Sequence, residues 1–108
     1  MNIIEVDLPT VLQQINGDMV SIVERICLAE SLTVTLRGTL ASYSGSIHWH
    51  FKNGKARGTL ELTWWPARNR LWFKVAGGRA APWIEACLPR LKAKLEQALD
   101  AGQSAAEV

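Results

Sequence analysis

Both histidines of the 108-residue chain lie in the segment HWH, residues 48–50. Imidazole nitrogens bind metal ions and transfer protons near neutral pH, so this pair is the first place to look for chemistry. In an extended strand His48 and His50 project from one face, about 6.6 Å apart along the strand. A metal site needs a third converging ligand, and Glu61 is on the same face of the next predicted strand, but a tight hairpin sets it opposite Ser46. We therefore predict no metal and no cofactor.

Hydrolytic chemistry has weaker support in the sequence. Three serines lie within residues 42–46, just before His48, but a serine–histidine couple also needs an orienting group and an oxyanion site, and neither is visible. The Gly-Gly-Arg run of residues 77–79 precedes a helix start, where backbone donors can bind phosphate, although a turn between sheet and helix is the simpler interpretation. A metal-dependent or hydrolytic enzyme using His48 and His50 is our third hypothesis.

Tryptophan and basic residues are interspersed in GTLELTWWPARNRLWFKV, residues 58–75, which contains three of the five tryptophans. Strand alternation places Trp64 in the core and Trp65 and Trp72 on the polar face. Indole rings among cations can stack on nucleic-acid bases beside bound phosphates, or anchor an acidic protein. The predicted binding face consists of Arg37, His48, His50, Arg57, Trp65, Arg70, Trp72 and Lys74.

Charge is distributed unevenly, although the net charge is only +2. Residues 37–81 contain eight Lys and Arg and one acid, whereas residues 1–36 contain one Arg and five acids. A basic block of this kind favours an acidic partner. Our leading hypothesis is a small non-enzymatic binding or adaptor domain. It would engage an acidic protein partner, or itself as a homodimer, through the predicted binding face.

Nucleic acid or another polyanion is the alternative partner for the same face. The sequence has no RNP pattern, KH loop or Cys/His finger, so no named nucleic-acid module supports this hypothesis. A structural explanation is also open. The acidic N-terminal segment, with Glu24 and Glu30 meeting the basic residues, or a second copy of the chain can cover Trp72.

The elements that position these residues are four predicted strands. Apolar and polar residues alternate through residues 32–37, 47–52, 59–64 and 70–75, which predicts an antiparallel meander with one apolar face. An Asn-Gly pair at residues 53–54 predicts a two-residue turn that sets Trp49 opposite Gly58. A four-residue loop, PARN, sets Trp64 opposite Leu71 and Trp65 opposite Arg70.

Helices are expected before and after the meander in the sequence. Residues 18–30 have apolar side chains at helical spacing after Asp18, a natural N-cap, although a strand also fits. The segment IIEVDLP is either a strand or an extended lead-in, and a short helix can follow Pro9. Near the C-terminus, apolar residues at helical spacing predict a helix, and Pro89 within this pattern predicts a kink or a restart. This apolar stripe consists of Ile84, Cys87, Leu88, Leu91, Leu95 and Leu99.

These elements predict an α+β fold of two layers, with N-terminal helix or helices and a C-terminal helix packed on one face of a four-stranded antiparallel meander. We expect residues 1–100 to form a single domain and residues 101–108 to form a flexible tail. The main C-terminal helix is expected over residues 89–99. With 48% hydrophobic residues, no apolar run near 20 residues and no basic leader, we expect a cytoplasmic protein that does not enter a membrane. Cys27 and Cys87 are expected to be buried thiols without a disulfide.

Overall fold

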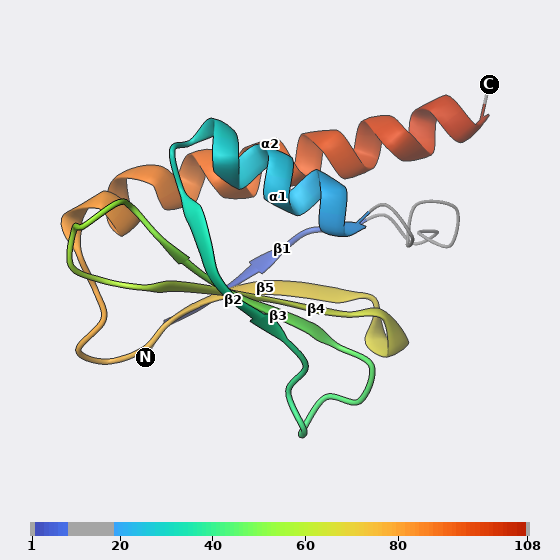
Figure 1. Cartoon of the computed structure of the whole chain (residues 1–108). Helices are drawn as coiled ribbons and strands as arrows, with labels where there is room; N and C mark the ends of the chain where they lie inside the picture. Colours follow the sequence, from blue (N-terminus) through green and yellow to red (C-terminus); the bar gives the residue numbers. More distant parts are fainter. Residues whose placement is uncertain (1, 9–18, 108) are drawn as a thin grey trace.

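Two helices cover one face of a five-stranded antiparallel sheet in the computed structural model, which describes residues 2–8 and 19–107 (Figure 1). The elements in chain order are β1 (Asn2–Val6), α1 (Met19–Ala29), β2 (Thr33–Gly38), β3 (Ile47–Lys52), β4 (Leu60–Trp65), the 3-10 helix η2 (Pro66–Arg68), β5 (Arg70–Val75) and α2 (Pro82–Glu107). The predicted α+β class is confirmed. The short helix expected after Pro9 and the Asp18 cap lie outside the described residues.

The sheet has the strand order β1-β5-β4-β3-β2, so β2 to β5 form the predicted meander. The prediction of four strands was one short, because the N-terminal segment forms β1 and pairs with β5 at the edge. Ile4 lies opposite Phe73 and Glu5 opposite Trp72 in that pairing. This short segment alternates too briefly to be distinguished from a lead-in before its partner strand is known.

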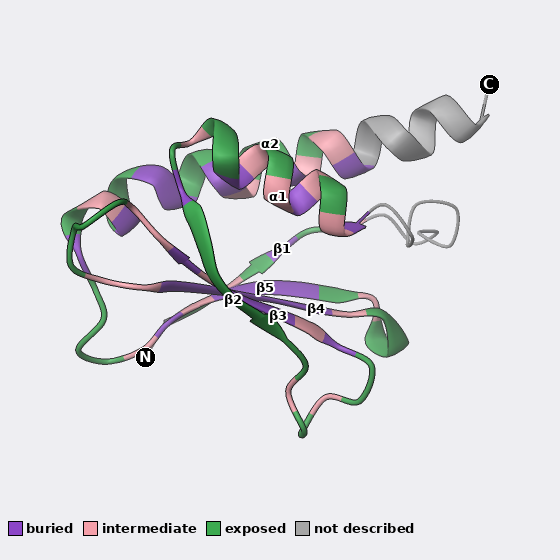
Figure 2. Cartoon of the chain, in the orientation of Figure 1, coloured by how far each residue is buried: buried purple, intermediate pink, exposed green. Residues whose placement is uncertain are grey.

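The core lies between the sheet and the helices, and β4 at the middle of the sheet is buried along almost its whole length (Figure 2). Large side chains at alternate positions of β3, β4 and β5 face the helices, as the alternation predicts. They are Trp49, Phe51, Leu60, Leu62, Trp64, Leu71 and Phe73. The stripe predicted for the C-terminal helix packs against them, and every member of that stripe is buried.

The β4–β5 hairpin has the predicted register. Trp64 lies opposite Leu71 and Trp65 opposite Arg70. The PARN loop closes the hairpin with a single 3-10 turn, after which Asn69 adopts a left-handed φ of 51°. Asparagine tolerates this conformation better than most residues, so the loop chemistry fixes the register locally.

The β3–β4 register differs from the prediction. Trp49 lies opposite Leu62, not Gly58, so β4 is displaced by four residues relative to the tight hairpin. A turn does form at the Asn-Gly pair, where Ala56 N–H donates to Asn53 O (3.0 Å), but the connection extends over residues 53–59. Because four is an even number, every β4 side chain keeps its predicted face but gains different cross-strand neighbours.

Arg37 is on the opposite face from the predicted one. The β2–β3 register shifts between Val34 and Leu36, which places Leu36 opposite His50 and Arg37 opposite Trp49. Arg37 therefore lies on the helix side, where its Nη1 donates to Glu24 Oε2 of α1 (2.8 Å). A bulge inverts the alternation beyond it, which periodicity alone does not predict.

The helices are confirmed with changed limits. Residues 19–29 are helical, which resolves the choice between helix and strand, and Met19, Val23 and Cys27 are buried. α2 passes through Pro89 without restarting and continues to Glu107, beyond the expected main helix. Cys27 and Cys87 are free and buried, as predicted. Neither helix, within the described residues, has the length and apolarity required to span a bilayer.

Candidate metal centre

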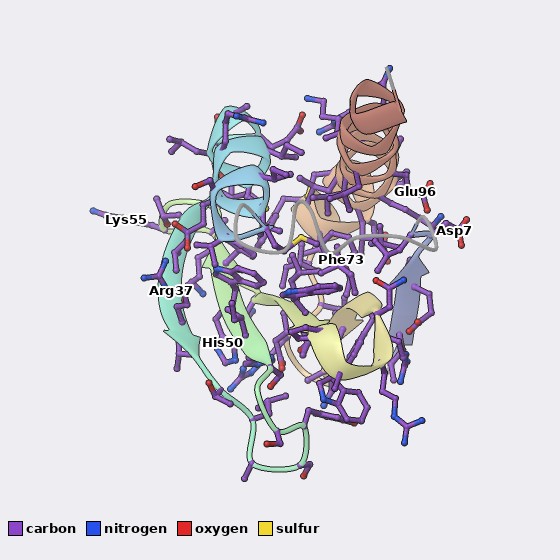
Figure 3. All side chains as sticks on the ribbon, turned by 90° about the vertical axis from the view of Figure 1, so that its right-hand side faces the viewer. Asp7, Arg37, His50, Lys55, Phe73 and Glu96 are labelled. Atoms are coloured by element: carbon purple, nitrogen blue, oxygen red, sulfur yellow. The ribbon has the colours of Figure 1, made fainter. Side chains whose placement is uncertain are left out.

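Three side chains of types that can bind metals converge on the sheet face that the helices leave uncovered. His48 and His50 project from β3, and Glu61 projects from β4 directly opposite His50. Phe73 lies on the helix side of the sheet and His50 on the other side (Figure 3). The same β3–β4 register that differs from the tight hairpin places Glu61 beside the histidines. We call His48, His50 and Glu61 the triad.

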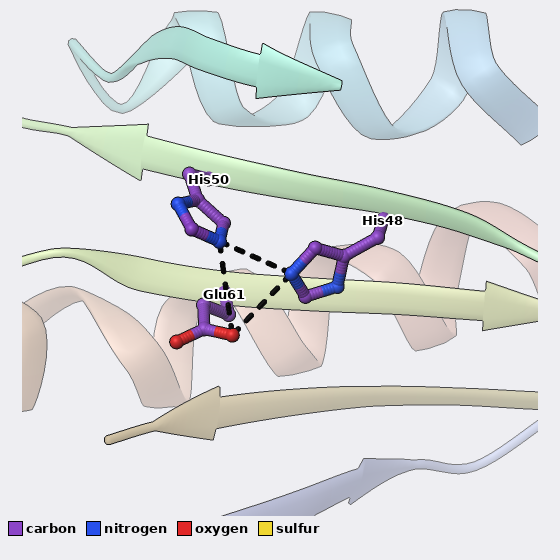
Figure 4. A group of neighbouring side chains, drawn as sticks. All are labelled: His48, His50 and Glu61. Atoms are coloured by element: carbon purple, nitrogen blue, oxygen red, sulfur yellow. Dashed lines mark hydrogen bonds and ion pairs between the residues drawn. The ribbon is translucent and has the colours of Figure 1, made fainter. Parts of the chain in front are cut away.

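The three ligand atoms of the triad point toward one another (Figure 4). His48 Nε2 lies 3.1 Å from His50 Nε2, and Glu61 Oε1 lies 3.3 Å from His48 Nε2 and 3.8 Å from His50 Nε2. Ligand atoms of a tetrahedral zinc ion are about 3.3–3.4 Å apart, given bonds of about 2.0–2.1 Å. A triangle with the observed sides has its centre about 2.0 Å from each corner, a zinc bond length.

The second ring nitrogen of His48 has its own partner. His48 Nδ1 lies 2.7 Å from Thr63 Oγ1, and both side chains are buried. When Nδ1–H donates to this hydroxyl, the lone pair of Nε2 is directed at the other two members of the triad. Metal-binding histidines are oriented by a hydrogen bond of this kind on the far nitrogen.

The surroundings of His48 favour its neutral form. Burial lowers the pKa of His48, and the neighbouring His50 and Lys74 lower it further, whereas Glu61 acts in the opposite direction. A neutral imidazole is the form that binds metals. Both histidines belong to the predicted binding face, but His48 is only 6% exposed on it.

Glu61 is a buried carboxylate that requires compensation for its charge, because an unpaired buried charge is strongly destabilising. Besides the histidines, Arg79 Nη1 lies 3.7 Å from Glu61 Oε2, and Lys74 lies opposite Glu61 on β5. Arg79 belongs to the Gly-Gly-Arg run, whose predicted role as a turn fits the hydrogen bond from Arg79 N–H to Ala76 O (3.0 Å). The carboxylate thus has one oxygen toward the histidines and the other toward Arg79.

The aromatic end of the same face is covered by the loop of residues 39–46. The Tyr43 ring packs edge-on against Trp65 and Trp72, with centroids 4.8 and 5.2 Å away. Trp65 Nε1–H donates to Ser44 O (3.2 Å), and the Arg70 guanidinium lies 4.5 Å from the Trp72 centroid. Trp72 is consequently only 4% exposed, and its cover is Tyr43 and Arg70.

The remaining predicted binding residues are separated from one another. Arg70 forms a bidentate ion pair with Glu5 of β1, at 3.1 and 2.6 Å. Arg57 is exposed on the 53–59 loop, where its carbonyl accepts the Trp83 indole N–H (2.7 Å). Arg37 faces the helices, as described above. Of the predicted face, the structure brings together His48, His50 and Lys74 at one end and Trp65, Arg70 and Trp72 at the other, whereas Arg37 and Arg57 lie elsewhere.

Three residues that shape this face, Glu61, Thr63 and Tyr43, are absent from the predicted binding face. Glu61 was considered as a ligand but set aside because of the register, whereas Thr63 and Tyr43 carried no recognisable signal. The serines before His48 have other roles, since Ser46 is buried and its Oγ accepts the Leu40 N–H (3.2 Å).

Comparison of the chain with known protein families, curated proteins and solved structures finds no match, so its function is inferred from this face alone.

Proposed function

We propose that the protein binds a divalent transition-metal ion, zinc in the first instance, through His48 Nε2, His50 Nε2 and Glu61 Oε1. The observation that carries this proposal is the triangle of ligand atoms with sides of 3.1, 3.3 and 3.8 Å, which leaves room at its centre for one ion. A divalent ion at the centre would replace the hydrogen bond between the two histidines and their contacts with Glu61 by three metal–ligand bonds.

The ligand types indicate which metals fit. Two imidazoles and one carboxylate suit zinc, and the same set binds ferrous iron, whereas calcium and magnesium prefer oxygen ligands alone. Three protein ligands leave at least one coordination position open. Open positions characterise catalytic zinc sites, whereas structural sites are closed by four protein ligands. The proposal therefore assigns the protein a metal site of the open type, on which hydrolytic chemistry can be built.

Docking of an acidic partner has less support from the same residues. Trp72 is covered, Arg70 is paired with Glu5, and Arg37 faces the helices. A stacking platform needs accessible rings next to unpaired cations. The acidic-partner and nucleic-acid hypotheses stay predictions, and the metal centre is the function that the geometry supports best.

The test is metal binding by protein expressed without a histidine tag, stripped with chelator and titrated with zinc against a coloured competitor. We expect one zinc ion per chain. His50→Ala and Glu61→Gln should each weaken binding by ten-fold or more, because each removes one of three ligands. Titration with cobalt should produce the visible absorption of a low-coordinate site, and zinc should raise the midpoint of thermal unfolding because it binds the folded state.

Glu5→Gln is the matched control, since Glu5 is a carboxylate on the same face but belongs to the pair with Arg70. Its zinc affinity should equal that of the unaltered chain. Circular dichroism of each variant establishes that the fold is retained. The proposal is wrong if the stripped protein binds no zinc, or if zinc affinity is the same after His50→Ala.

A further inference from the structure

We propose that the open coordination position of this centre takes an oxyanion, inorganic phosphate being the simplest, which Arg79 and Lys74 hold together with the metal. The inference rests on the proposed function, because it requires the metal to be in place. It goes further by naming the chemical class of the ligand that the site accepts.

Two cations stand beside the triad on the side of Glu61. Lys74 lies opposite Glu61 in β5, and Glu61 lies opposite His50 in β3, so the three residues form one row across adjacent strands. Arg79 reaches the same carboxylate from the turn before α2, with Nη1 3.7 Å from Oε2. At that distance the Arg79 guanidinium is near Glu61 without forming a bidentate pair, so its donors are available to a second acceptor.

The charges of this cluster do not balance once a metal is bound. A divalent ion, Lys74 and Arg79 together carry four positive charges, and Glu61 supplies one negative charge. Concentrated positive charge at an accessible site attracts anions, and guanidinium and ammonium groups bind phosphate oxygens with charge-assisted hydrogen bonds. An oxyanion on the metal supplies the missing charge, which a neutral water ligand does not.

The site is reachable from solvent. Both helices cover the other face of the sheet (Figure 1), and the side chains of His50 and Arg79 are 22% and 49% exposed. His48 and Glu61 are buried, whereas His50 and Arg79 are partly exposed beside them. An anion can therefore approach the metal past Arg79.

The experiment uses the full chain loaded with cobalt, whose visible spectrum reports changes at the open position. Titration with inorganic phosphate should alter that spectrum in a saturable way. Arg79→Gln and Lys74→Gln should each weaken phosphate binding by about ten-fold, because each removes a charge-assisted contact. Arg68→Gln is the control, since Arg68 lies near Trp65, 5.8 Å from its ring centroid, and its removal should leave the phosphate affinity unchanged.

The outcomes distinguish failure of the oxyanion inference from failure of the metal centre on which it rests. Failure to bind cobalt is seen before phosphate is added, and it overturns the metal centre itself. A cobalt spectrum that stays unchanged at saturating phosphate overturns the oxyanion inference while the metal centre stands. Equal phosphate affinity in Arg79→Gln, Lys74→Gln and the unaltered chain also overturns it. So does equal phosphate binding by metal-free protein, measured by calorimetry.

Discussion

Glu24 shows how one side chain can decide the position of two others. Its Oε2 accepts hydrogen bonds from Trp49 Nε1–H (2.9 Å) and from Arg37 Nη1 (2.8 Å). The Trp49 ring is fully buried, and a buried indole N–H needs an acceptor. Glu24 provides it from α1, and the same carboxylate holds Arg37 on the helix side of the sheet. Strand alternation reveals neither this partner on α1 nor the register shift in β2, so the sequence assigns Arg37 to the other face.

We expect Glu24→Ala to destabilise the fold by about 1–3 kcal/mol, the cost of leaving a buried donor unsatisfied. Arg37→Ala should cost only about 0–1 kcal/mol, because it removes a half-exposed ion pair and leaves the indole bonded. Urea unfolding followed by circular dichroism measures both losses. Glu24→Gln, which keeps an acceptor for the indole, should resemble Arg37→Ala. Equal losses for Glu24→Ala and Arg37→Ala would show that the indole bond contributes nothing.

At the scale of elements, the two hairpins show when the local sequence is enough to determine the strand register. PARN specifies the β4–β5 register by itself, and its pairings were predicted residue by residue. The Asn-Gly pair forms a turn but does not set the β3–β4 register, because Thr59 N–H bonds to Arg79 O (3.1 Å) and extends the loop. The predicted faces survived because the displacement is even. The triad was not predicted, because which residue lies opposite His50 depends on the size of the displacement itself.

Gly58 is the residue that lets the longer β3–β4 loop pack against the start of α2. Its φ is +103°, and a Cβ at this position would lie 2.6 Å from Ala81 Cβ and 3.0 Å from Arg79 O. Gly58→Ala therefore combines backbone strain with a steric clash, and we expect it to destabilise the fold by about 2 kcal/mol or more. Thermal unfolding of the purified variant measures the effect.

Gly38→Ala is the comparison for this prediction. A Cβ at Gly38 meets nothing within 4 Å, and this residue has no positive φ, so its replacement should change stability little. A Gly58→Ala variant as stable as Gly38→Ala would contradict the packing described here.

At the scale of the whole molecule, Glu30 joins the two helices. It accepts hydrogen bonds from Arg90 Nε (3.0 Å) and Lys94 Nζ (2.6 Å) of α2, from its place just after α1. The sequence left open that Glu30 meets the basic residues of the sheet, but its partners Arg90 and Lys94 lie on α2. The hydrogen bonds from Lys94 and Arg90 lower the pKa of Glu30 below its ordinary value.

A lowered carboxyl pKa stabilises the folded state at every pH above the value in the unfolded chain, about 4.3 for glutamate. The contribution disappears as the pH falls through the lower, folded-state pKa. Glu30→Gln should therefore be less stable than the unaltered chain at pH 7, and this difference should shrink below pH 4. Urea unfolding at pH 7, 5, 4 and 3 measures it, and a difference that is constant across this range would contradict the assignment. Arg25→Gln, at an exposed position of α1, controls for general charge effects.

The place of β1 in the strand order has a consequence for biosynthesis. Among the described strands β1 pairs with β5 alone, so this pairing cannot form until residues 70–75 have left the ribosome. α2, which supplies much of the core, emerges later still. Completion of the sheet and closure of the core must therefore follow translation of β5 and α2, and products that end before α2 would leave the apolar face of the sheet uncovered.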